Sequence, residues 1–180
     1  MKKTESLWSV PVAMEDIPDT GLHLEIEAPA AARDAVAELA GLRDLPQLTA
    51  VFDLTRQGAG VHVTGRVSAK VGQNCVVTLE PVENAVEETI DLDFAPSQAV
   101  ATDKNAKTTR KRAAADDPPE PLVDGALDLG ALATEFLILG IDPYPRKVGV
   151  EFAAPKVEDA GEHPFAALQA LKKSPGGGPH

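Results

Sequence analysis

The chain has 180 residues and carries 28 acidic against 17 basic side chains, which gives a formal net charge of −11. A single cysteine, Cys75, excludes both a disulfide framework and a four-cysteine zinc site, and no apolar run approaches the roughly 20 residues of a membrane span. The acidic surface favours basic partners and disfavours nucleic acid such as DNA, except where positive charge is locally concentrated.

Apolar and polar residues alternate along the first half of the chain, which is typical of half-buried strands. The alternation predicts strands over residues 8–12, 22–27, 48–57, 61–71 and 82–94. Cys75, Val77 and Leu79 share one phase and extend this strand pattern. Short connections, such as Gly58-Ala59-Gly60, predict an antiparallel meander with one dry face and one wet face.

Two stretches have helical spacing instead. The alanine-rich stretch Pro29 to Ala40 ends before Gly41, and we expect it to bury Ala32, Val36, Leu39 and Ala40. Asp128 is suited to cap a second helix that Gly140 ends, with a buried stripe of Leu129, Leu132, Phe136 and Leu139. The predicted fold class is therefore α+β, with an antiparallel, strongly twisted or partly closed β-sheet and two or three packed helices.

The remaining segments lack a packing pattern. Residues 96–119 are polar, begin and end with proline, and predict one long disordered loop. Beyond Phe152 the sequence predicts a linker, a short amphipathic helix over 164–173 and a flexible C-terminal tail rich in glycine and proline. We therefore expect a single domain over residues 1–152, including the mobile loop 96–119, followed by the linker, helix and tail over 153–180.

No residue pattern indicates an enzyme, so we expect no catalytic residue, no metal site and no cofactor. Cys75 lies in core phase between valines, and a buried inert thiol is the simplest interpretation. His23 and His62 occupy outward strand positions, and no phosphate-binding glycine loop connects a strand to a helix. A hydrolase stays open as an alternative, which Cys75 and His62 facing inward together would support.

Charged segments indicate binding more strongly than catalysis. Within the predicted loop, five cations are candidate contacts for RNA phosphates, against the alternative of a loop that only adds solubility: Lys104, Lys107, Arg110, Lys111 and Arg112. Tyr144 with Arg146 is a second candidate RNA-binding pair, because an aromatic ring there adjoins cations after a turn stiffened by prolines.

Two further features are candidates for binding a protein. Glu87 and Asp91, with Glu83 and Asp93, predict an acidic strand face that is either merely solvated or receives a basic protein. Arg66 and Lys70 on the neighbouring strand are expected to pair with it. Near the C-terminus an apolar stripe either folds back on the sheet or is offered to a partner groove, and it consists of Phe165, Leu168 and Leu171.

Several motifs together resemble a known family. The runs Val63-Thr64-Gly65-Arg66-Val67 and Gln73-Asn74-Cys75-Val76-Val77-Thr78-Leu79-Glu80-Pro81-Val82 resemble the central signature of the YceD family, the large ribosomal RNA subunit accumulation proteins. Leu127-Asp128-Leu129-Gly130 and His163-Pro164-Phe165-Ala166-Ala167-Leu168 are similar to its later signatures. Many members carry Cys-x-x-Cys in the central signature, whereas Thr78 takes the second cysteine position here. A thiolate metal site is therefore not expected.

This resemblance implies a cytoplasmic, non-enzymatic ribosome-biogenesis factor that supports accumulation or processing of large-subunit (23S) ribosomal RNA. The implied partner is large-subunit rRNA or its precursor, or a basic ribosomal protein, with no membrane and no DNA involved. The alternatives are a protein-binding adaptor without RNA contact and, behind it, an uncharacterised hydrolase.

Overall fold

The structure is a computed structural model that describes residues 7–96, 119–122 and 125–152. The chain divides after Val148, and every helix and strand given below lies in the first unit, Met1–Val148. The main sheet has the strand order β2-β3-β4-β5-β6. Its strands are β2 (Leu22–Glu27), β3 (Asp44–Gln57), β4 (Gly60–Asn74), β5 (Pro81–Pro96) and β6 (Glu120–Leu122).

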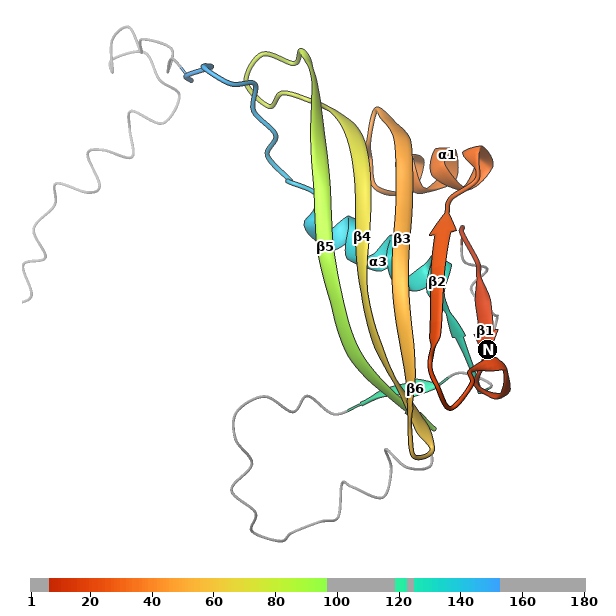
Figure 1. Cartoon of the computed structure of the whole chain (residues 1–180). Helices are drawn as coiled ribbons and strands as arrows, with labels where there is room; N and C mark the ends of the chain where they lie inside the picture. Colours follow the sequence, from red (N-terminus) through yellow and green to blue (C-terminus); the bar gives the residue numbers. More distant parts are fainter. Residues whose placement is uncertain (1–6, 97–118, 123–124, 153–180) are drawn as a thin grey trace, which may run out of the picture. The chain divides into compact units, whose positions relative to one another are not determined.

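The first four strands of this sheet pair antiparallel, and β6 pairs in parallel with the last residues of β5. A second, two-stranded sheet joins β1 (Pro11–Ala13) to β7 (Ala126–Asp128). The helices are α1 (Ala30–Leu39) and α3 (Leu129–Gly140), with a 3-10 turn, η1, at Met14–Asp16. Figure 1 shows α3 crossing behind the long strands. The prediction of an α+β fold with an antiparallel meander is confirmed.

One face of the sheet carries the hydrophobic core, as the alternation predicts. On β3 and β4 the inward residues are at most 5% exposed: Leu48, Ala50, Phe52, Leu54, Val61, Val63, Val67, Ala69 and Val71. Both helices pack on this face, because the buried residues of α1 and α3 join the same core. Gly65 is part of this packing, since a Cβ atom there would lie 2.9 Å from a ring carbon of Phe52. The opposite face is left without a helix in the described part of the chain.

The β3–β4 hairpin closes through a two-residue turn, Gly58-Ala59, because Gln57 pairs with Gly60. Gly58 has a φ of 61°, which a glycine adopts without a steric penalty at the first position of a type II′ turn. The sequence correctly predicted this turn.

The expected helix faces need a correction at both leucines near the helix ends. Leu39 is 63% exposed and Leu139 is 73% exposed, whereas Ala37 and Leu137 are buried. In α3 the reason is the close approach of its glycines: a Cβ atom on Gly130 would lie 2.7 Å from the Trp8 carbonyl oxygen. The helix therefore turns its small residues toward the segment around Trp8. The side of the helix that carries Leu139 faces away from the core.

The start of α3 follows its predicted cap. The Asp128 carboxylate accepts hydrogen bonds from the backbone N–H of Ala131 at 3.1 Å and of Val10 at 2.9 Å. Ser9 donates its hydroxyl to the same carboxylate at 2.8 Å. A side-chain cap satisfies backbone donors that the first helical turn leaves free, and here it also ties the helix to the segment before β1.

The predicted strand through Cys75, Val77 and Leu79 is wrong. These residues form a turn between β4 and β5, in which Leu79 has a φ of 61° and is 76% exposed. Leu79 is the one described non-glycine residue with a positive φ. The Leu79 N–H donates to the Cys75 carbonyl at 2.9 Å, so the chain reverses here and cannot continue the strand.

Candidate functional site

The uncovered face of the main sheet collects an excess of carboxylates. We call it the outer face, and its charged residues come from alternate positions of four strands: Glu25, Glu27, Asp53, Glu83, Glu87, Asp91 and Asp93, against the cations Arg66 and Lys70. Seven acids therefore oppose two permanent cations on one face. The β4–β5 register places Thr64 opposite Asp91 and Ser68 opposite Glu87, so short polar side chains alternate with the acids.

Two histidines are embedded among these acids. His62 on β4 lies with its Nδ1 2.8 Å from Asp93 Oδ1 and its Nε2 3.7 Å from Asp91 Oδ1. His23 on β2 lies 2.7 Å from Asp53 Oδ1 by its Nδ1. The Asp53 carboxylate raises the pKa of His23 above its usual 6.5, first through this hydrogen bond and then through its charge. Protonation of this ring is therefore favoured by the acidity of the face around it.

The expected partners of Arg66 and Lys70 are not those observed. The register sets Arg66 opposite Thr89 and Lys70 opposite Ala85, and the ion pairs across β4 and β5 are made by His62 instead. Glu83 and Glu87 form no ion pair within the described residues. Carboxylates without a cationic neighbour keep their charge available to a partner.

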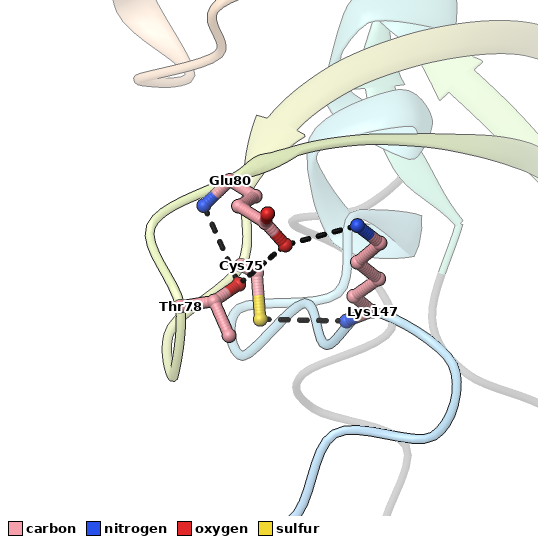
Figure 2. Close-up of polar contacts among 4 residues, drawn as sticks. All are labelled: Cys75, Thr78, Glu80 and Lys147. Carbon is pink, nitrogen blue, oxygen red and sulfur yellow. Dashed lines mark hydrogen bonds and ion pairs between the residues drawn. The ribbon is translucent and has the colours of Figure 1, made fainter.

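A second polar region lies at the turn between β4 and β5, and we call it the Cys75 turn. It comprises residues 75–80 together with the segment 144–147 that lies against them. The Val76 N–H donates to the Pro145 carbonyl at 2.9 Å, and the Cys75 N–H donates to the Glu80 carbonyl at 2.8 Å. The Cys75 side chain is fully buried, and its Sγ accepts the Lys147 N–H at 3.4 Å. Figure 2 shows how the side chains of Cys75, Thr78, Glu80 and Lys147 converge.

Hydrogen-bond donors set the ionisation of this turn. The Thr78 hydroxyl, followed by the Lys147 N–H, lowers the pKa of Cys75 to about 6, although burial acts in the opposite direction. The Lys147 ammonium lies 2.9 Å from Glu80 Oε2 and lowers the pKa of Glu80. The Thr78 hydroxyl also lies 3.3 Å from Glu80 Oε2, and its single hydrogen can serve either acceptor.

This arrangement does not assemble a nucleophile with a base. Cys75 follows the C-terminal end of β4, whereas His62 lies near its N-terminal end on the outer face. Twelve strand residues lie between His62 and Cys75, which corresponds to a separation of about 40 Å along the strand. Within the described ranges, no three side chains of histidine, cysteine, aspartate or glutamate are grouped to hold a metal ion. The pairing that would have supported a hydrolase is therefore not observed.

The structure places four of the candidate binding residues. Glu87 and Asp91 are exposed on the outer face, and Tyr144 and Arg146 are exposed at the Cys75 turn, with Tyr144 at 70%. The Tyr144 N–H donates to Asp142 Oδ1 at 2.8 Å, which fixes the turn that displays the ring. The other candidates lie outside the described residues: Lys104, Lys107, Arg110, Lys111, Arg112, Phe165, Leu168 and Leu171.

Sequence reasoning missed part of the acidic face. Glu25, Glu27 and Asp53 share it with the acids of β5, although they come from β2 and β3. The signal for them was present, because all three occupy outward positions of predicted strands. Recognising one common face required the strand order and register, which pattern alone does not supply.

A comparison with protein families adds the evidence for identity. Residues 63–172 match the family described as Large ribosomal RNA subunit accumulation protein YceD, and this match spans more than half of the chain. The chain belongs to the YceD family. The YceD match begins within β4 and includes the Cys75 turn, β5 and α3, so β1, β2, α1 and β3 precede it. No curated protein and no solved structure matches the chain.

Membership of the YceD family links the protein to the accumulation of large-subunit ribosomal RNA. The YceD family consists of large ribosomal RNA subunit accumulation proteins and is not a known enzyme family. Neither helix in the described part of the chain is long and apolar enough to cross a membrane.

Proposed function

We propose that this YceD protein supports accumulation of large-subunit rRNA by binding a basic ribosomal protein on its outer face, in the cytoplasm. The observation that carries the proposal is the excess of seven carboxylates over two cations on a sheet face that no described helix covers. Proteins that bind RNA phosphates need clustered lysine and arginine, and such clusters complement this surface.

The electrostatic contribution to binding depends on the number of charges on the outer face and on its partner. One pair of opposite charges 4 Å apart in water is worth only about 1 kcal/mol, and a single exposed ion pair often contributes less. Several carboxylates on one face act together on a partner with several cations, and they also accelerate its association. A basic protein held in this way is kept from unspecific contacts with RNA until it is delivered.

The test measures binding of purified large-subunit ribosomal proteins to the full chain, at low and at moderate salt. The variant combines Glu83→Gln, Glu87→Gln and Asp91→Asn on the outer face. A matched control combines Glu15→Gln, Asp19→Asn and Glu38→Gln, which removes the same charge from exposed positions elsewhere. We expect binding to weaken at least about tenfold in the first variant and to change little in the control. Equal losses in both would contradict a local surface and indicate only net charge.

Direct RNA binding is the second candidate, and the exposed Tyr144 beside Arg146 favours it, because bases stack on aromatic rings and on guanidinium groups. The same proposal includes the five cations of the sequence stretch 96–119: Lys104, Lys107, Arg110, Lys111 and Arg112. Replacing these five by alanine separates the two candidates. Loss of RNA retention with unchanged binding of ribosomal proteins supports the RNA contact, and the reverse result supports the outer face.

A further inference from the structure

In the described part of the chain, one edge of β5 has no strand partner over most of its length. Its other edge pairs with β4 from Pro81 to Phe94, whereas β6 pairs with it only at residues 94–96. Within the described residues, 82–93 therefore present a free strand edge about 40 Å long (Figure 1). Every second residue of such an edge directs its N–H and C=O groups outward, where another strand can bind them.

The inner side of β5 is incompletely covered, as expected of a sheet that ends one strand early. The inward residues Val86 and Ile90 in the middle of β5 are buried, but Leu92, opposite the fully buried Val63 of β4, is only partly buried. Val82, near the other end of β5, is also only partly buried. Apolar side chains from an additional strand would cover these residues.

The charge of β5 indicates which strand fits. The strand carries five acids and no lysine or arginine: Glu83, Glu87, Glu88, Asp91 and Asp93. Pairing β5 with the same edge of a second copy would bring like charges together, which destabilises a strand pair. Lysine or arginine at alternate positions of an incoming strand would instead face four of these acids on the outer face.

We propose that the free edge of β5 binds an extended basic segment of the partner protein as an additional strand. The segment alternates cations, which face the outer carboxylates, with apolar residues, which cover Val82 and Leu92. This inference rests on the proposed function and adds the mode of recognition. The opposite sheet edge, β2, spans six residues and offers only half of the length of the free edge over 82–93.

The probe is a nine-residue peptide in which lysine alternates with valine, added to the full chain at low salt. Its control is the same peptide with every backbone nitrogen methylated, which keeps the side chains and charge but has no backbone donors. Binding is measured by calorimetry, and hydrogen exchange of the β5 amides is followed by NMR. We expect the methylated peptide to bind at least about tenfold more weakly. The first peptide should slow exchange at alternate residues within 82–93, because amides bonded to β4 are protected already.

Each other outcome decides against strand addition in a distinguishable way. Equal binding of the two peptides, lost on Glu87→Lys with Asp91→Lys, overturns strand addition and leaves the acidic outer face supported. If neither peptide binds, both strand addition and the acidic outer face as a binding surface are overturned. Alternate β5 amides protected before any peptide is added show that another segment or a second copy fills the edge, and dependence on protein concentration separates these two occupants.

Discussion

The outer face and the Cys75 turn both involve β4 and β5, yet they use polar residues in opposite ways. On the outer face several carboxylates have no cationic neighbour, so charge accumulates over a broad surface. At the Cys75 turn several polar groups have short-range partners, among them the Lys147–Glu80 ion pair and the Cys75 sulfur that accepts the Lys147 N–H. The difference indicates that the face is built to bind and the turn is built to hold two chain segments together.

Both regions depend on the same sheet, in which Gly65 packs against Phe52. Disrupting this packing should give the largest change in the free energy of unfolding. Gly65→Val places a branched side chain where a Cβ atom alone would lie 2.5 Å from the Val51 carbonyl oxygen and 2.9 Å from Phe52. Overpacking of this kind should lower the free energy of unfolding by about 3 kcal/mol. Urea denaturation measures it, and Thr64→Val on the outer face is the control. Similar midpoints for the two variants would contradict the packing described for Phe52.

Removing the buried sulfur separates the turn from the face. Cys75→Ala deletes a fully buried atom that accepts the Lys147 N–H, and we expect a loss of about 1–2 kcal/mol in the free energy of unfolding. Binding of basic ligands to the outer face should not change. Calorimetric unfolding and a binding titration on the same sample check both statements. Weaker binding without loss of stability would make the turn part of the binding surface.

The ionisation of Cys75 gives a pH test of the turn. Its pKa falls from an ordinary 9.0 to about 6, so the thiolate stabilises the folded state at high pH. This contribution grows as pH rises from 6 toward 9 and is lost as pH falls through 6. Thiolate absorbance near 240 nm should show the midpoint. Thr78→Val removes the main donor and should move the midpoint upward, whereas an unchanged midpoint would assign the effect to the backbone.

The smallest expected effect concerns His23 on the outer face. Its pKa is raised by Asp53, so its protonation favours the folded state below pH 6.5, and this contribution disappears as pH rises through the raised pKa. Asp53→Asn should return the pKa toward 6.5, as followed by NMR of the ring protons. Glu27→Gln, on the same face without a contact to His23, is the matched control. A pKa that stays raised in Asp53→Asn would attribute the shift to the face as a whole.

Much of the fold could be predicted from the sequence because apolar and polar residues alternate strictly along the strands. Leu48 to Leu54 and Val61 to Val71 bury every second side chain, and the burial of one face fixes their period. The helix stripes were less well predicted, since Gly130 allows a close approach that no hydrophobic pattern reveals. The turn at Cys75 escaped prediction because Val77 and Leu79 mimic a strand, while tertiary hydrogen bonds to Pro145 and Lys147 decide its conformation.

The candidate site was predicted only in part for a similar reason. Exposed acids on β5 could be identified from their phase, but their combination with Asp53 and Glu25 depends on strand neighbours far apart in the chain. The register also explains why Asp93 pairs with His62 and not with a lysine or arginine, because His62 lies directly opposite it. Register is fixed by the folded sheet, and a single strand pattern does not contain it.

The parallel pairing of β6 with the end of β5 has a consequence for the stretch between them. Phe94 lies opposite Glu120 and Pro96 opposite Leu122, so both ends of residues 97–119 are anchored at the same end of one strand. Closing a chain between fixed points costs only about 0.6 kcal/mol more when its length doubles. Insertions and deletions there should leave the scaffold intact, which makes this position a natural place to graft peptide tags or reporter sequences.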